Sequence, residues 1–594
     1  MDIQSFYRGH TFDAYNYLGA HMGGGYTTFR TFAPNAAGIV LLLGEERAEH
    51  PMNRVHDGNF YEVTVPGGCS GTPYEYRIYQ RDGSYTDHCD PFGFGMDMRP
   101  AHRSILRDLS AYTFHDEQWM AQRSNHLAAP LNIYELHLGS WRKKGEDAEW
   151  YRYDELAEPL IAYLKESGYN YVEFLPLSEH PCDESWGYQN TGFFSPTSRY
   201  GTATELMRLI DQLHQNGIGA ILDFVPVHFA VDNYGLAKYD GSFLYEYPHE
   251  DVGVSEWGSY NFLHSRGEVR SFLQSSANYW LKEFHFDGLR MDAISRIIYW
   301  QGDERRGVNG NAVDFVKVMN RGLKERNPGC ILAAEDSTQY PNVTKPVDHG
   351  GLGFDYKWNM GWMHDTLQYF QMSPEQRVDQ YHKLTFSMMY FRDEQFLLPF
   401  SHDEVVHGKA TILQKMNGDY EQKFPQGRAM YLYMLLHPGK KLNFMGNEIG
   451  QLREWDEKRQ QDWDLRRYPL HDSFYHYMAE LNHIYQTYPA LSEWDYRDEG
   501  FRWLDCHQES RCIYAIERSA PNQRLAAVFN FSAATQENYT VKIPNAKGVQ
   551  LLIHSDWHRF SGSTPEDACP FRFEKEHLTC TLPPFSGMLF LVKK

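Results

Sequence analysis

Apolar and polar positions alternate along the first hundred residues of the chain. The segments Tyr26–Phe32, Phe60–Val65 and Tyr74–Tyr79 change side-chain character at every second residue, which is typical of half-buried β-strands. Turn-forming residues separate these segments. We expect an antiparallel β-sandwich over residues 1–115, followed by a loosely structured segment between about residues 115 and 130.

A different pattern begins near Asn132, where short β-rich apolar runs alternate with helical patterns. Between the second and third runs, Thr202 and Glu205 form a capping box, and Gly217 marks the end of the helix. Eight strand–helix units predict an α/β fold, a (β/α)8 TIM barrel over residues 116–490, with active-site residues at the carboxyl ends of the strands. The runs are Ile133–Leu138, Tyr171–Leu177, Ala220–Val225, Phe286–Met291, Ile331–Glu335, Phe354–Trp358, Phe396–Phe400 and Lys441–Met445.

Two further regions differ from the barrel pattern. The stretch 229–265 is too long for a plain loop and predicts a lobe over the site. A helix is predicted at Phe474–Tyr485. The alternating segments Arg524–Phe531 and Met588–Val592 then predict an antiparallel β-sandwich, an all-β domain over residues 491–594.

Charge and composition limit the classes of partner. The 594 residues include 57 Lys and Arg against 78 Asp and Glu, a formal net charge of −21. This acidic balance argues against nucleic acid, because affinity for a phosphate backbone depends on basic side chains. No run of about 18 apolar residues occurs, so no membrane span is predicted. Aromatic residues form 15 % of the chain, which suits protein cores and also flat platforms for sugar rings.

The N-terminal residues and the cysteines bear on the cellular compartment of the protein. The start, Met1–Phe6, lacks the basic residues and apolar run of a signal peptide. The eight cysteines are scattered and form no Cys-x-x-Cys pair, which fits reduced thiols. We therefore expect a cytoplasmic protein.

Acidic residues stand at the carboxyl ends of four predicted barrel strands. Asp223 lies in the third apolar run, and Glu335 is the last residue of the fifth. Asp292 follows the fourth run, and Asp403 follows the seventh. Each of them alone is more often a strand-end cap or a solvated acid. Four of them at one barrel mouth indicate catalysis, because burying unpaired carboxylates is costly.

The neighbours of these acids suggest a division of roles. Arg290 and Asp292 are two residues apart on one strand, so both side chains point to the same face, where the guanidinium favours an ionised, nucleophilic carboxylate. Glu335 follows an apolar stretch that suits a protonated acid. One ionised and one protonated carboxyl group are what cleavage of a glycosidic bond with retention requires. His228 and His402 flank the set and can hydrogen-bond sugar hydroxyls.

Four segments in this order resemble the signature regions of the α-amylase superfamily: Asp223–His228, Gly288–Asp292, the segment around Glu335, and Ser401–Asp403. A finer resemblance is to the α-1,4-glucan branching enzymes, which make the α-1,6 branches of glycogen. It rests on Ile133–Trp141, Ser185–Gln189, Gly353–Asn359, His402–Gly408, Met445–Glu448 and Arg453–Trp455.

The resemblance implies roles for individual residues and a retaining double displacement. Asp292 is the expected nucleophile, Glu335 the general acid/base and Asp403 the transition-state stabiliser. The residues expected to hold the sugar at the cleaved bond are Tyr188, by stacking, with Asp223, His228, Arg290 and His402. The resemblance also implies an α-glucan as partner, no cofactor and no metal, and we expect a monomer. Gly288, where many branching enzymes have Ala, and Phe193-Phe194, where Tyr-Tyr is frequent, depart from the family pattern.

Two alternatives remain at this point. One is an α-glucan hydrolase of the same superfamily, either debranching or trehalose-releasing. The other is a catalytically inactive glucan-binding scaffold, against which the intact acids argue. The pair His402 and His407 does not indicate zinc, because a zinc-protease helix needs His at i and i+4 and these are five apart.

Overall fold

The computed structural model describes residues 1–145 and 150–593. The described residues form two compact units. The first contains residues 1–125, 173–354 and the described part of 137–159; the second contains 126–136, 160–172 and the described chain from 355 onward.

The predicted N-terminal sandwich is confirmed as two antiparallel sheets in the first unit. The strands of the first sheet are β1 Gly19–Gly23, β2 Tyr26–Phe32, β6 Phe60–Pro66 and β5 Asn53–Val55. Those of the second are β4 Ala48–Pro51, β3 Gly38–Leu43, β7 Pro73–Tyr79 and β8 Tyr85–His88, with β9 Ser104–Ile105 paired to β7. Two of the three glycines at 23–25 have positive φ in the β1–β2 connection, a conformation that a side chain would strain.

The predicted barrel is also confirmed: eight strands close in chain order, and each contains part of one of the eight predicted apolar runs. The strands are β10 Asn132–Leu136, β11 Tyr171–Phe174, β14 Gly219–Phe224, β17 Gly288–Met291, β18 Ile331–Ala334, β19 Tyr356–Trp358, β20 Phe396–Phe400 and β21 Lys440–Phe444. The strand pairs β14–β17, β17–β18, β19–β20, β20–β21 and β10–β21 are parallel.

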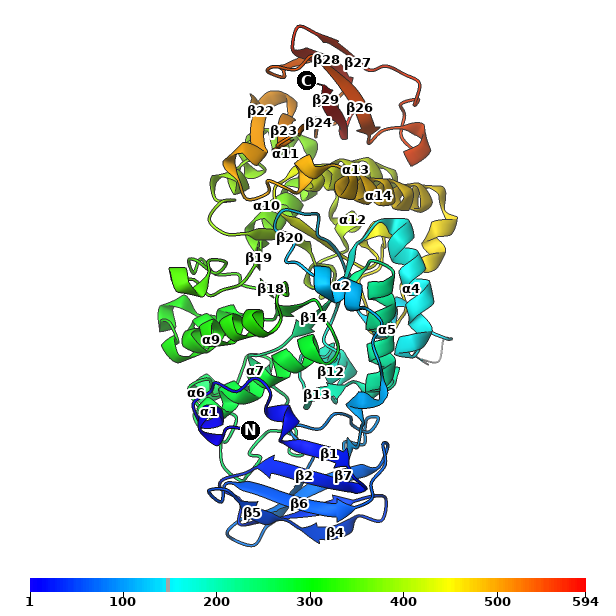
Figure 1. The fold of residues 1–594 in the computed structure, drawn as a ribbon. Coiled ribbons are helices and arrows are strands. Elements are labelled where there is room, and N and C mark those ends of the chain that lie inside the picture. Colours follow the sequence, from blue (N-terminus) through cyan, green and yellow to red (C-terminus); the bar gives the residue numbers. More distant parts are fainter. Residues whose placement is uncertain (146–149, 594) are drawn as a thin grey trace. The chain divides into compact units, whose positions relative to one another are not determined.

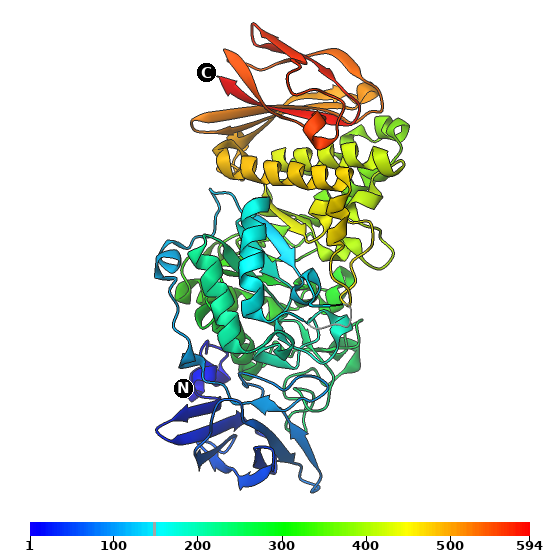
Figure 2. The ribbon, with the colours of Figure 1, turned by 90° about the vertical axis from the view of Figure 1, so that its right-hand side faces the viewer.

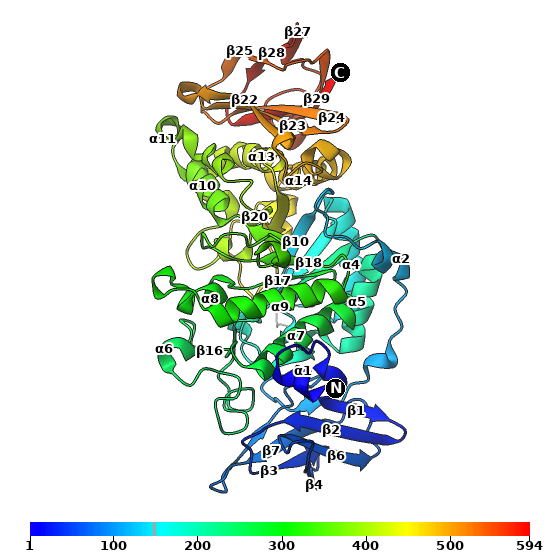
Figure 3. The same ribbon diagram turned by 60° about the vertical axis from the view of Figure 1, so that its left-hand side comes forward.

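Helices of the first unit surround its barrel strands, and Figure 1 shows α5, α7 and α9 beside β14 and β18. Helix α5 begins at the predicted capping box of Thr202 and Glu205. Figure 3 shows α1 against α7, where the Ser271 hydroxyl donates to the Phe6 carbonyl at 2.9 Å. The helices are α1 Ile3–Tyr7, α2 Glu117–Gln122, α3 Leu138–Trp141, α5 Ala203–Gln215, α6 Glu250–Gly253, α7 Gly267–Lys282, α8 Ser295–Ile298 and α9 Gly310–Arg326; α4 Tyr153–Ser167 spans the boundary between units.

The segment expected to be loosely structured contains helix α2. It is six residues long, too short to show a helical period in the sequence. Its Trp119 is held by tertiary contacts: the indole N–H donates to Asp287 at 2.8 Å, and the ring stacks on His214 with centroids 5.1 Å apart. In the region 229–265, β16 Tyr260–Asn261 pairs with β15 His228–Phe229, and α6 lies between them in the chain.

The second unit carries the remaining helices and the C-terminal sandwich. Helices α13 and α14 pack against each other, and Figure 2 shows the golden helix α14 beneath the C-terminal strands. The predicted helix at 474–485 is part of α14, which starts earlier, with Pro469 at its first turn. The helices are α10 Met360–Gln371, α11 Pro374–Asp379, α12 Ile412–Lys415, α13 Tyr420–Leu436 and α14 Pro469–Thr487.

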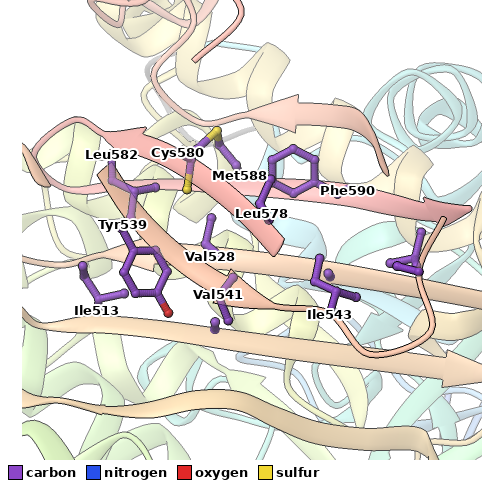
Figure 4. Packing of buried hydrophobic residues seen from close by; sticks show 14 residues of the cluster. Ile513, Val528, Tyr539, Val541, Ile543, Leu578, Cys580, Leu582, Met588 and Phe590 are labelled. Carbon is purple, nitrogen blue, oxygen red and sulfur yellow. The ribbon is translucent and has the colours of Figure 1, made fainter. Parts of the chain in front are cut away.

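Two sheets form the C-terminal sandwich, as predicted. Their facing side chains make an apolar core, in which Val528, Met588 and Phe590 of one sheet meet Val541 and Leu578 of the other (Figure 4). One sheet has the order β22 Phe501–Gln508, β23 Ile513–Ala520, β24 Gln523–Asn530, β29 Ser586–Lys593, β26 Gly548–His554; the other has β25 Gln536–Lys542, β28 His577–Leu582, β27 Phe571–Glu574.

Candidate active site

Three neighbouring strands of the first unit bring predicted site residues together. Asp223 lies in β14 and pairs in register with Arg290 of β17, which pairs with Ala333 of β18. Asp292 follows β17 directly, and Glu335 follows β18 directly. Because the strands are parallel, these side chains meet at the same, carboxyl end of the sheet.

Arg290 is the centre of this cluster. Its Nη1 donates to Asp292 Oδ1 at 2.7 Å and to both carboxylate oxygens of Asp223 at 2.9 Å. Its Nη2 lies 3.9 Å from Oε2 of Glu335. Burial alone would lower the pKa of this guanidinium, but the carboxylates, Asp223 first, raise it well above its usual value. Arg290 is therefore a permanent, fully buried cation that holds three acids around it.

Asp223 differs electrostatically from an exposed aspartate. Burial raises its pKa to about 7, although Arg290 opposes this rise and Asp292 adds to it. The Tyr188 hydroxyl donates to Asp223 Oδ2 at 2.5 Å. Tyr188 was expected to act by stacking on a sugar; the structure gives its hydroxyl a second use, which is to complete the hydrogen bonding of Asp223.

Glu335 is held by backbone rather than by a cation alone. The Ala293 N–H donates to Glu335 Oε2 at 2.8 Å, and the Ile294 N–H donates to the Glu335 carbonyl at 2.9 Å. Ala293 takes up a positive φ of 48° to do this, a conformation that costs a non-glycine residue about 1 kcal/mol. The residue after Asp292 thus fixes the carboxyl group of Glu335, which links the two acids through one peptide unit.

His228 lies beside the predicted lobe. Burial lowers the pKa of this imidazole to about 4, so the ring is neutral near pH 7. Its ring centroid is 5.4 Å from that of Trp257, which is 48 % exposed. The Arg296 guanidinium lies over the same indole, 5.0 Å from the centroid. A neutral imidazole next to an exposed indole is a suitable surface for a sugar ring.

The second unit carries the last two predicted residues, His402 and Asp403, in a 3-10 helix directly after β20. His402 Nδ1 is 2.5 Å from Glu135 Oε1, and the His402 backbone N–H donates to Glu135 Oε2 at 3.0 Å. His402 Nε2 lies 3.4 Å from Asp403 Oδ1. Lys409 Nζ donates to the Asp403 carbonyl at 2.8 Å, which holds the loop that carries this acid.

Glu135 is the residue that sequence reasoning missed. In the sequence, Glu135 was noted only as part of the segment Ile133–Trp141, one of the motifs shared with the branching enzymes. The signal was present, because every residue of β10 is buried and an acid in such a strand needs a partner. The identity of that partner, 267 positions away in the chain, was not readable from the pattern.

No group of three or more His, Cys, Asp or Glu side chains among the described residues is arranged to hold a metal ion. No helix in the part of the chain that the structure describes is long and apolar enough to cross a membrane.

An eight-stranded parallel barrel with acids and an arginine at its strand ends defines a catalytic domain of the α-amylase class. The family model of the α-amylase catalytic domain matches residues 158–242 and 259–526, and that of the α-amylase C-terminal all-β domain matches 503–593. Solved structures share the fold. A pullulanase from Anoxybacillus sp. LM18-11 with bound maltotetraose superposes with a TM-score of 0.76 at 18 % identity, over 99 % of this chain and 89 % of that one. A type I pullulanase from Bacillus subtilis with maltose gives 0.74 at 19 %, over 97 % and 85 %.

Closer relatives narrow the class. The N-terminal domain model of the α-1,4-glucan branching enzyme GlgB matches residues 1–92. The chain is 41 % identical to the 1,4-α-glucan branching enzyme GlgB of Geobacillus stearothermophilus, over 100 % of this chain and 96 % of the relative. It is 40 % identical to that of Bacillus subtilis, over 100 % and 98 %. The chain belongs to the 1,4-α-glucan branching enzyme family, as its motifs indicated, and these relatives do not favour the hydrolase alternative.

Proposed function

We propose that this chain cleaves internal α-1,4 bonds of a linear α-glucan and joins the released chain to a 6-hydroxyl, which makes the α-1,6 branches of glycogen. Its family membership supports this activity and an α-glucan substrate. At the level of residues, the observation that carries the proposal is the buried Arg290, bonded to Asp223 and Asp292 beside the amide-held carboxyl group of Glu335.

The first step forms a covalent glycosyl-enzyme. A carboxylate oxygen of Asp292 attacks the anomeric carbon while Glu335 protonates the glycosidic oxygen, so that the leaving chain departs with a 4-hydroxyl. The guanidinium of Arg290 at 2.7 Å stabilises the anionic form that a nucleophile needs. The bond from the Ala293 N–H keeps the carboxyl group of Glu335 next to Asp292 as it changes protonation state.

The second step transfers the chain. Glu335, now a carboxylate, takes the proton from the 6-hydroxyl of a second glucan, whose oxygen displaces Asp292 from the anomeric carbon. Two displacements at one carbon restore the α configuration. Water competes for the glycosyl group, so transfer depends on a site that orients the acceptor hydroxyl.

The remaining predicted residues stabilise the sugar at the cleaved bond. We assign the stabilisation of the positively charged transition state to Asp403, on its position after a strand of the same barrel. We assign sugar contacts to His228, with its neutral ring, and to His402, Tyr188 and Asp223. These roles follow the family pattern residue by residue.

We also propose that the enzyme needs no cofactor, works in the cytoplasm, binds no nucleic acid and is a monomer. The reaction exchanges one glycosidic bond for another and uses no metal or organic cofactor. We place the protein in the cytoplasm on its eight cysteines, which are scattered along the chain and form no Cys-x-x-Cys pair, a pattern that fits reduced thiols. The net charge of −21 supports the absence of a nucleic-acid partner. We propose a monomer, which sedimentation at several concentrations tests.

One experiment tests the activity. The enzyme is incubated with amylose while iodine absorbance and reducing ends are followed, and the product is then debranched and its chains are sized. We expect falling iodine absorbance, new α-1,6 linkages and few reducing ends. Asp292→Asn should abolish this activity, whereas Asp314→Asn, a change at an acid of α9 that is 62 % exposed, should leave it intact. Reducing ends that rise in proportion to bonds cut, without new branches, would indicate a hydrolase.

A further inference from the structure

Glu135 is a charged residue in a place where charge is costly. It lies in β10, whose five residues are all buried, and its own side chain is fully buried. A carboxylate in such a position needs donors for both oxygens, or the chain loses several kcal/mol of stability. Both oxygens of Glu135 are satisfied by one residue, His402.

The two bonds define the orientation of the imidazole. Glu135 Oε2 accepts the backbone N–H of His402 at 3.0 Å, which locates the carboxylate, and Oε1 is then 2.5 Å from ring Nδ1. A carboxylate at Nδ1 places a proton on that nitrogen and directs the opposite nitrogen, Nε2, away from β10. Nε2 is the ring nitrogen on the side of Asp403, 3.4 Å from Oδ1.

Aromatic rings complete the enclosure of this imidazole. The centroids of Phe444 and Trp455 lie 6.0 Å and 6.1 Å from that of His402, and these two rings contact each other at 5.2 Å. His402 is 2 % exposed. Glu135 Oε1 lies 2.5 Å from Nδ1 of this imidazole, and Asp403 Oδ1 lies 3.4 Å from Nε2. Because Glu135 bonds both the backbone N–H and Nδ1 of His402, its carboxylate fixes the rotation of the ring and the position of its proton.

We propose that Glu135 is a positioning residue of the branching reaction, which acts through His402 by holding its Nε2 edge toward Asp403 and the sugar at the cleaved bond. This inference rests on the proposed function, because that function makes His402 a sugar-binding residue. Glu135 itself touches no substrate. Its effect is on the transition state, because the hydrogen bond from a sugar hydroxyl to His402 requires a fixed ring.

The first test is Glu135→Gln, which keeps the volume of the side chain. A glutamine replaces one of the two acceptor oxygens by a donating NH2 group, so either the backbone N–H or Nδ1–H of His402 then faces a donor. We expect kcat on amylose to fall about tenfold to a hundredfold, the range known for partners that orient metal-binding histidines, while KM changes less than about twofold. An unchanged kcat, or a rise in KM alone, would overturn the proposal.

A double-mutant cycle separates positioning from general structural damage. The kcat values of Glu135→Gln, His402→Gln and the double variant are compared with that of the unmodified enzyme. If Glu135 acts through His402, adding Glu135→Gln to His402→Gln lowers kcat no further. Multiplicative effects would show that Glu135 acts independently and would refute the role. Glu135→Asp provides the same cycle if the glutamine variant does not fold.

Glu448→Gln is the matched control. Glu448 is also fully buried, and it accepts from the hydroxyl of Tyr134, the residue before Glu135 on β10, at 2.9 Å and from that of Tyr163 at 2.5 Å. Its replacement should lower thermal stability without the loss of kcat that depends on His402. The unmodified enzyme distinguishes the two failures: if it forms no α-1,6 branches, the proposed function fails, whereas branching with multiplicative variants refutes only the role of Glu135.

Discussion

His214 offers a prediction whose size follows from the structure. Its Nδ1 is 2.7 Å from Asp116 Oδ2 and its Nε2 is 2.9 Å from Asp287 Oδ2. The three side chains are at most 1 % exposed. An imidazolium donates to both carboxylates, whereas a neutral imidazole must turn a lone pair toward one of them. Burial alone lowers the pKa of His214, but Asp287 and Asp116 raise it to about 9.

The sign of the pH dependence follows from this shift. A folded-state pKa of about 9 against an ordinary 6.5 corresponds to about 3 kcal/mol of stability. Because the folded pKa is the higher one, this contribution is fully present below pH 6.5 and is lost as the pH rises through 9. Burial raises the pKa values of Asp116 and Asp287, but their interactions with histidine lower these pKa values overall. The stability that these two carboxylates contribute is therefore lost as the pH falls below the usual carboxyl range.

The variant His214→Gln and the unmodified protein are unfolded in urea at pH 6, 8 and 10. Glutamine carries no charge at any of these values, so the difference in unfolding free energy should shrink by about 3 kcal/mol between pH 6 and pH 10. His10→Gln, at an exposed histidine of the same unit, should show no such change. A difference for His214→Gln that stays constant across this range would show that the ion pairs with Asp116 and Asp287 do not raise the pKa of His214.

Three further substitutions test the packing of β17 and the site at the carboxyl ends of the strands. Gly288→Ala introduces a Cβ 2.5 Å from the backbone oxygen of Ile331, so β17 and β18 must move apart. We expect the free energy of unfolding in urea to fall by about 1–3 kcal/mol. An unchanged midpoint would contradict this close approach of the two strands. Tyr188→Phe keeps the ring but removes the donor to Asp223, and kcat/KM on amylose should fall about tenfold; full activity would leave only a stacking role. In Arg290→Lys, the lysine ammonium cannot bond two carboxylates in the geometry of the guanidinium. The branching rate in the iodine assay should fall at least a hundredfold, roughly 3 kcal/mol in activation free energy. A near-normal rate would show that the guanidinium is not needed for the reaction.

Much of the fold could be predicted from local patterns. The eight barrel strands lie within or overlap the predicted runs, because a buried parallel strand appears in a sequence as a short apolar segment. The capping box at Thr202 marked the start of α5 for a similar local reason. Helix α2 was missed because tertiary contacts of Trp119, rather than a six-residue pattern, hold it in place.

The residues of the candidate site could be proposed from the sequence, but the hydrogen bonds between them could not. That Arg290 and Asp292 share a face follows from their spacing on one strand. The second use of Tyr188, as a donor to Asp223, required the loop that carries it to fold back onto β14. A side chain that can both stack and donate gives no local sign of which it does.

The order of the barrel strands and the acids that follow them can be read from the amino-acid sequence, because strand periodicity and strand ends are properties of neighbouring residues. The hydrogen-bond partners of these acids depend on the folded chain. Arg290 bonds Asp223 across 67 positions, and Glu135 bonds His402 across 267. Such pairs depend on strand register and on closure of the barrel, which bring distant residues within about 3 Å of each other. No periodicity along the chain contains that information.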